Sequence, residues 1–156
     1  MPRPGDETAI VNSAPAFVDH YLAFLLAKAS RLISGEFHAT LKAQGIPVSE
    51  WRILAALRDG PLAVTRLADL ILEQQPTASR LVQRMAEAGL VQRRACAEDG
   101  RRTLVELTRR GRQRSDDLTA LAMRHQEDTL APFGPERAGE LLDTLRDLIR
   151  QHDRPA

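Results

Sequence analysis

The sequence has a single cysteine, Cys96, so it cannot form an intrachain disulfide. Glycine-rich phosphate loops, nucleophile elbows and close Ser/His/Asp arrangements are absent. We expect no metal and no other cofactor, because no two histidines have the spacing of a metal site; the histidines are His20, His38, His125 and His152. A small enzyme is therefore the hypothesis with the least support.

Long hydrophobic runs and aromatic residues are also scarce. The longest apolar stretch near the N-terminus, residues 21–27, is too short to span a bilayer, and the first residues lack the hydrophobic region of a signal peptide. We therefore expect a cytoplasmic protein with no membrane partner. Aromatic residues make up 4% of the chain, whereas hydrophobic residues make up 43%. A core built mainly from Leu and Ala favours packed helices over sheet.

Two short helices are predicted between residues 64 and 88. The first, roughly 64–72, has apolar residues on one face at helical spacing, namely Val64, Leu67, Ala68 and Ile71. After a turn at 73–75, the second starts at Pro76, which has no N–H to lose in a first turn, and ends before Gly89. Its buried stripe is predicted to consist of Ala78, Leu81, Val82 and Met85.

The outer face of the second helix is polar and has no acidic residue before Glu87. Arg and Gln make bidentate contacts with guanine and adenine edges, and Ser and Thr bond bases or phosphates. The same composition is also typical of a solvated helix face, so the segment that follows has to decide between the two interpretations. The candidate DNA-contacting residues of this helix are Gln75, Thr77, Ser79, Arg80, Gln83 and Arg84.

A basic β-hairpin is predicted directly after this helix. Residues 103–107 alternate between two faces, as a strand does, residues 90–94 supply its partner, and Asp99-Gly100 is a two-residue hairpin signal. Residues 62–63 would add a minimal third strand. Arginine is favoured in a narrow minor groove, so a loop with Asp99, Arg101 and Arg102 would give a second contact with a duplex. This order of elements is the plan of a winged helix-turn-helix.

The net charge of +1 conceals an uneven distribution. Segment 80–114 holds ten arginines and four acidic residues, an excess of six positive charges. Such a segment in a near-neutral protein is typical of a phosphate-binding surface, although arginines that cap helices or keep a surface soluble would give the same count. The candidate phosphate contacts are Arg93, Arg94, Arg109 and Arg110.

Several short motifs follow one another in this region: Leu67-Ala68, Thr77 to Arg80, the helix stop Gly89-Leu90-Val91, Arg93, and the wing pattern Asp99-x-Arg101 followed by Leu107-Thr108-x-x-Gly111. Together they resemble the MarR family of bacterial transcriptional regulators. The resemblance implies a mainly α fold with a small β-hairpin wing, a winged helix-turn-helix lobe and a helical dimerisation region. One departure is the turn, which in this family often contains glycine and a Ser or Thr cap, whereas this chain has Leu72, Glu73 and Gln74.

The helices on both sides of the lobe are predicted to dimerise the protein. We divide the chain into a flexible arm (1–12), an N-terminal dimerisation helix (13–44), the winged lobe (46–108) and C-terminal dimerisation helices (109–152). Ser49 and Thr108 are expected to cap helices. The apolar face of the first helix is wider than one small domain needs, which favours a homodimer over a monomer with these helices folded back. A dimer would place two second helices in successive major grooves, about 34–36 Å apart.

The expected function is a homodimeric regulator, in this family most often a repressor, that binds double-stranded DNA at a pseudo-palindromic operator. The alternative is a winged-helix protein-interaction module that does not bind DNA. Arginines near Cys96 would favour a thiolate, but the redox-sensing branch of the family has its cysteine in the N-terminal helix, so we interpret Cys96 as a small packing residue.

The resemblance also implies a small aromatic or phenolic effector, bound in the cleft between the dimer helices and the lobe. Each candidate contact is also an ordinary helix-face or core residue, so the assignment has two interpretations. The candidates are His20, His38, Trp51, Arg52 and His125.

Overall fold

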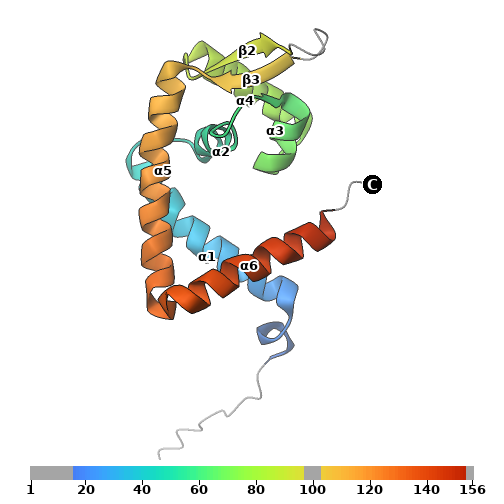
Figure 1. Ribbon diagram of the computed structural model, residues 1–156, viewed down its shortest axis with the longest axis vertical. Helices are drawn as coiled ribbons and strands as arrows, with labels where there is room; N and C mark the ends of the chain where they lie inside the picture. The colour runs from blue at the N-terminus through green and yellow to red at the C-terminus, as the bar shows by residue number, and fades with distance from the viewer. Residues whose placement is uncertain (1–15, 97–102, 154–156) are drawn as a thin grey trace, which may run out of the picture. The chain divides into compact units, whose positions relative to one another are not determined.

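The computed structural model describes residues 16–96 and 103–153, which divide into one compact unit up to Glu36 and a second from Phe37 onward. The fold is mainly α with a small sheet, as predicted. The helices are α1 (Leu22–Ala43), α2 (Val48–Ala56), α3 (Val64–Ile71), α4 (Gln75–Glu87), α5 (Arg109–Leu130) and α6 (Gly134–His152), and the strands are β1 (Leu62–Ala63), β2 (Val91–Ala95) and β3 (Thr103–Leu107) (Figure 1).

The first unit starts with a short 3-10 helix, Phe17–Asp19, and continues into α1. The expected helix over 13–44 is therefore not continuous, because α1 begins at Leu22; its expected start at residue 13 lies outside the described residues. The Asp19 carboxylate accepts a hydrogen bond from the Ala16 N–H (3.2 Å), which closes a tight turn, and His20 at φ −120° leaves the helical region. The apolar side chains of this unit are exposed, among them Phe17, Leu22, Leu25, Leu32 and Ile33.

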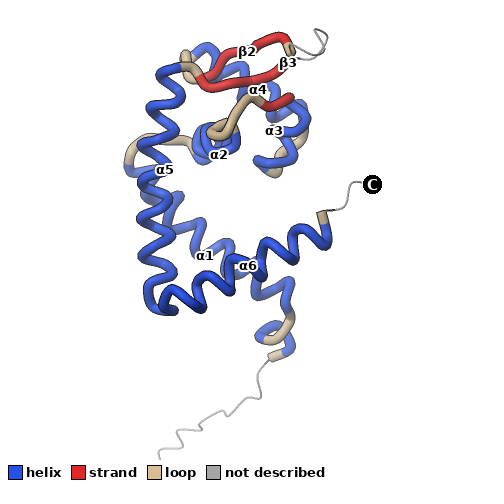
Figure 2. Tube along the Cα trace, in the orientation of Figure 1, coloured by secondary structure: helices blue, strands red, loops and turns tan. Residues whose placement is uncertain are grey.

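The second unit contains the winged lobe, which we define as α2 to β3. The sheet has the order β1-β3-β2, with all neighbours antiparallel (Figure 2). The short third strand is confirmed, since Leu62 is paired with Val105. Val91 is paired with Leu107, and Ala95 with Thr103, so β2 and β3 run side by side as a hairpin.

The core of the winged lobe is built from the faces that the apolar periodicity indicated. All of the predicted stripe on α4 is buried, as are Leu67, Ala68 and Ile71 of α3. Leu118 of α5 joins these residues in one hydrophobic cluster. The helix-turn-helix is thus held by continuous apolar packing, and the polar face of α4 is left outside.

Two predicted helix starts need correction. Ser49 does not cap α2: it is the second residue of that helix, and Pro47 occupies the N-cap position at φ −64°. Proline fixes φ near this value, and the ψ of 138° makes Pro47 the extended residue before the helix. Pro76 lies in the first turn of α4, but α4 begins one residue earlier, at Gln75.

Close contacts join α5 to the winged lobe. Thr108 caps α5 as predicted, since its Oγ1 accepts from the Gly111 N–H (3.0 Å) while it donates to the Gly89 carbonyl (2.7 Å). The fully buried Ser115 donates through Oγ to the carbonyl of Leu54 (3.1 Å), in the last turn of α2, where helix carbonyls lack helical partners. The N-terminal half of α5 is therefore anchored to the lobe.

Two ion pairs at the lobe surface reinforce this attachment. Arg114 Nε lies 3.1 Å from Glu50 Oε1, and Arg58 Nη1 lies 2.6 Å from Asp116 Oδ1. Both pairs connect α5 with α2 or the residues that directly follow it. Within the described ranges, no helix is long and apolar enough to cross a membrane.

Candidate nucleic-acid interface

The outward face of α4 has the polar composition that the sequence predicted. Arg80, Gln83 and Arg84 are exposed, and Thr77 is half-buried. These four residues and the edge of Leu81 line one open hollow of about 450 Å³. Gln75 is exposed in the first turn, and Ser79 is half-buried and does not line the hollow. One stretch of α4 thus displays a set of donors and acceptors next to the edge of its buried stripe.

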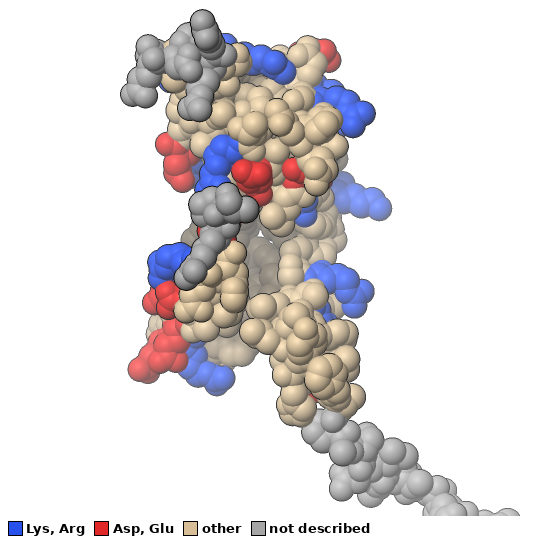
Figure 3. Space-filling view, turned by 90° about the vertical axis from the view of Figure 1, so that its right-hand side faces the viewer, with Lys and Arg blue, Asp and Glu red and all other residues tan. Residues whose placement is uncertain are grey.

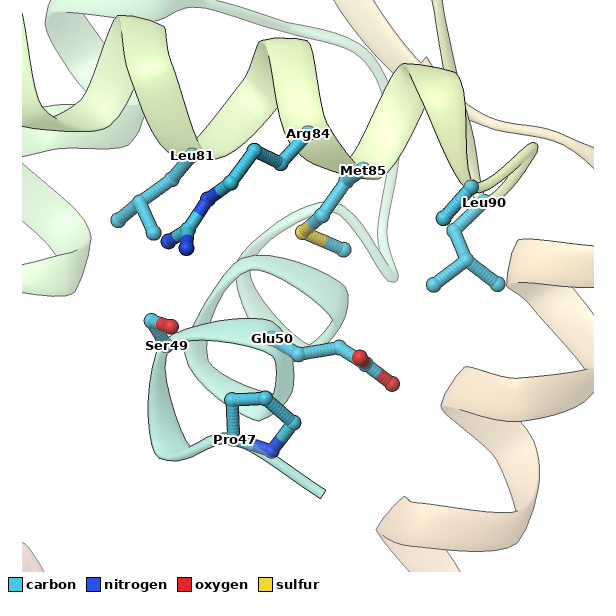
Figure 4. A pocket seen from close by; sticks show the side chains of 8 residues that line it. Pro47, Ser49, Glu50, Leu81, Arg84, Met85 and Leu90 are labelled. Carbon is cyan, nitrogen blue, oxygen red and sulfur yellow. The ribbon is translucent and has the colours of Figure 1, made fainter. Parts of the chain in front are cut away.

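Arg84 also lines a second cavity, which the sequence did not predict. Its side chain extends from α4 toward α2 and ends close to Ser49, while Leu81 and Met85 point the same way and Glu50 lies below (Figure 4). These residues, together with Pro47, Ala88 and Leu90, line a cavity of about 160 Å³. Arg84 therefore lies at the border between the outer face of α4 and the cleft against α2.

The arginines of β2 are consecutive residues, so their side chains project from opposite faces of the hairpin. Arg93 and Arg94 are both exposed, and Arg94 Nε lies 3.5 Å from Glu106 Oε2 on the neighbouring strand. Gln92 donates to the other oxygen of Glu106 (2.8 Å). Of the predicted wing residues, Asp99, Arg101 and Arg102 lie outside the described residues.

The basic start of α5 is close to the end of α4. Arg109 and Arg110 are exposed, and Arg110 Nη1 donates to the carbonyl of Ala88 (3.2 Å), directly after α4. On the face shown in Figure 3, Lys and Arg lie among Asp and Glu. The exposed arginines described above belong to α4, β2 and α5.

Two of the predicted effector contacts lie beside the same aromatic ring. Trp51 packs edge-on against Phe37, with ring centroids 5.4 Å apart, and His125 lies tilted against Phe37 at 5.5 Å. His38 and Arg52 are half-buried on α1 and α2. His20 is exposed in the first unit, just after the 3-10 helix. Phe37 belongs to the apolar face of the first helix, for which the sequence predicted only a role in dimerisation. The aromatic cluster around Phe37 was therefore not predicted.

Two further side-chain contacts were also not predicted from the sequence. Gln83 Nε2 donates to Glu87 Oε1 (3.0 Å), and the spacing of four residues on a helix could have indicated this pair. No sequence signal predicts that Glu50 pairs with Arg114.

Cys96 is half-buried directly after β2. In the part of the chain that the structure describes, no group of three or more His, Cys, Asp or Glu could hold a metal ion.

A helix-turn-helix followed by a two-stranded wing, with a polar exposed second helix, defines the class of winged helix-turn-helix proteins. Residues 44–102 match the MarR family. The sequence is also 30% identical over 137 residues to the uncharacterized HTH-type transcriptional regulator YwoH of Bacillus subtilis (strain 168), covering 87% of this chain and 99% of that protein. The chain belongs to the MarR family and is a transcriptional regulator rather than an enzyme.

Solved structures agree with this assignment. The MarR family transcriptional regulator SPO1453 from Silicibacter pomeroyi DSS-3 is similar at a TM-score of 0.75 with 38% identity, over 86% of this chain and 99% of that one. NadR in complex with 4-hydroxyphenylacetate is similar at a TM-score of 0.75 with 25% identity, over 86% of this chain and 97% of that one. A fold of this family thus carries a bound small molecule in at least one relative.

Proposed function

We propose that the protein is a homodimeric, sequence-specific repressor that binds a pseudo-palindromic operator and is released by a small aromatic or phenolic effector. In this proposal α4 is the recognition helix in the major groove. Arg101, with Asp99 orienting it and Arg102 beside it, enters the minor groove. Arg93, Arg94, Arg109 and Arg110 contact phosphates.

The observation that carries the proposal is the shared hollow on α4. Thr77, Arg80, Gln83 and Arg84 together offer hydroxyl, amide and guanidinium groups on one exposed helix face. These are the groups that read base edges in the major groove. An ordinary solvated helix face would be expected to mix cations with acids, whereas Glu87 is the first acid on α4.

Apolar surface on the flanking helices supports the homodimer. In a single chain α6 has no buried residue, although its apolar residues recur at helical spacing. Leu141 is 44% and Ile149 62% exposed. An exposed apolar stripe of this kind on a helix marks an interaction surface, and a second copy of the chain would cover it.

The effector proposal has two supports. Trp51 and His125 converge on Phe37, which gives an aromatic cluster on the helices that would line the cleft. NadR, a relative with the same fold, is known with 4-hydroxyphenylacetate bound. Such a ligand shifts DNA binding only if it prefers one arrangement of the two lobes over the other.

Selection of bound duplexes from a random pool tests the DNA-binding proposal. We expect two inverted half-sites whose centres lie about 10 base pairs apart, because two symmetric recognition helices are separated by about one helical turn. The same duplex should bind less tightly as salt increases, since bound cations release counterions from DNA. If no duplex is enriched and binding does not depend on salt, the proposal fails and the protein-interaction module is favoured.

Replacing Arg93 with alanine should reduce the salt dependence of binding. Arg93 is exposed on β2, whereas the neighbouring Arg94 already pairs with Glu106. Loss of one phosphate contact lowers the slope of log K against log salt by about one unit and weakens binding similarly for all sequences. Arg146→Ala on α6, where the arginine pairs with Asp143, is the matched control and should leave the slope unchanged. Equal slopes for parent and Arg93→Ala would refute the phosphate assignment.

A further inference from the structure

We infer that Glu87 is a positioning residue that fixes the side-chain amide of Gln83 to read adenine in each operator half-site. The inference rests on the proposed function of α4 as the recognition helix. Gln83 is one of the residues that line the hollow, and Glu87 is the one acidic residue of α4.

The geometry is a hydrogen bond across one helical turn. Gln83 Nε2 donates to Glu87 Oε1 at 3.0 Å, and both side chains are exposed. An ionised carboxylate only accepts hydrogen bonds, whereas an amide has two N–H donors and one acceptor oxygen. The hydrogen bond to Glu87 therefore favours the orientation in which the nitrogen side of the Gln83 amide faces Glu87.

The fixed amide has one N–H and Oε1 left for a partner. Adenine presents the N7 acceptor beside the N6 donor in the major groove, so it matches this pair in a bidentate contact. Guanine presents two acceptors, N7 and O6, and Oε1 would face O6 without a hydrogen between them. An unrestrained amide could instead turn both N–H groups toward guanine, so Glu87 is what separates the two purines.

The negative charge of Glu87 makes the effect of replacing this residue on DNA affinity distinctive. A carboxylate beside the polyanion opposes binding to every sequence, because it repels phosphates. Removing it should therefore raise or preserve overall affinity while it lowers discrimination between adenine and guanine. A purely structural role would not do this, since an exposed pair at this spacing contributes only weakly to helix stability.

The test uses the full-length protein and the duplex obtained by selection. Each A·T pair of a half-site is replaced by G·C, and dissociation constants are measured for the parent, Glu87→Met, Gln83→Ala and the double variant. We expect the parent to prefer adenine at one position by at least about fivefold, the lower end for a bidentate contact. Gln83→Ala should abolish this preference and Glu87→Met should reduce it, in each case at that position only, and the double variant should show no loss beyond that of Gln83→Ala.

Two controls make the outcome specific. Glu73→Met removes an exposed acid from the turn before α4 and should change overall affinity without changing the adenine preference. Replacing the adenine with 7-deazaadenine removes the N7 acceptor and should weaken binding of the parent but not of Gln83→Ala. The inference is overturned if Glu87→Met keeps the preference, or if it changes all positions equally. Failure of every variant to bind any duplex would instead refute the proposed function.

Discussion

Replacing Gly111 with alanine is expected to lower the free energy of unfolding by about 3 kcal/mol or more, the upper range for overpacking. A Cβ at this position of α5 would lie 1.8 Å from the carbonyl oxygen of Leu90 and 2.8 Å from its carbon. That carbonyl cannot simply turn away, because it accepts a hydrogen bond from the Thr108 N–H (3.1 Å). The variant must move the start of α5 away from the Leu90 backbone or lose this bond.

Urea unfolding measures the effect, with Gly139→Ala as the matched control. Gly139 lies within α6, and a Cβ there would have no atom within 4 Å. The control should gain about 0.8–1 kcal/mol from the better helix propensity of alanine. Both variants and the parent have to be compared at one protein concentration, since the stability of a dimer depends on it. A Gly111→Ala protein as stable as the parent would show that α5 tolerates a wider separation.

The double variant Leu141→Glu, Ile149→Glu is expected to be monomeric and to bind the operator about 100-fold more weakly or worse. Both side chains belong to the exposed apolar stripe of α6, and burial of two unpaired carboxylates between protomers is strongly unfavourable. The second half-site contact of a dimer is effectively intramolecular, which raises affinity by about 10² to 10⁴. A monomer loses this gain even though its α4 is unchanged.

Sedimentation gives the oligomeric state, and titration of the selected duplex gives the affinity. Gln151→Glu introduces an acid at an exposed position of α6 away from that stripe, and it should stay dimeric with nearly the parent affinity. If the double variant remained dimeric, α6 would not be part of the dimer interface. A monomeric variant with parent affinity would contradict the requirement for two half-sites.

The sequence predicted the winged lobe well because its elements carry strong local signals. The stripe Ala78 to Met85 and the alternation from Thr103 to Leu107 each follow one period, and Thr108 stands where a helix needs a cap. Weak signals failed at helix starts. Ser49 is a good capping residue by type, but Pro47 takes that position, and the 3-10 turn closed by Asp19 delays the start of α1 until Leu22.

The candidate site was predictable in composition but not in arrangement. Local spacing was enough to find the polar face of α4. The contacts made by those residues depend on elements far apart in sequence, as when Arg84 extends toward α2 or Glu50 pairs with Arg114. Trp51 and His125 meet at Phe37 for the same reason. The roles of the individual residues in binding DNA and effector stay predictions.

Helix α5 has 22 residues and is therefore about 33 Å long. Its surroundings differ between its two ends. Ser115 and Leu118 are buried in the lobe, whereas Met123 is 46% exposed farther along. A rigid tilt of this helix would carry the lobe attached to its N-terminal half with it. A tilt of about 5° at the other end sweeps the lobe by about 3 Å, close to the rise of one base pair, about 3.4 Å. An angular change that leaves every hydrogen bond of α5 intact is thus large enough to move a recognition helix out of register with its half-site.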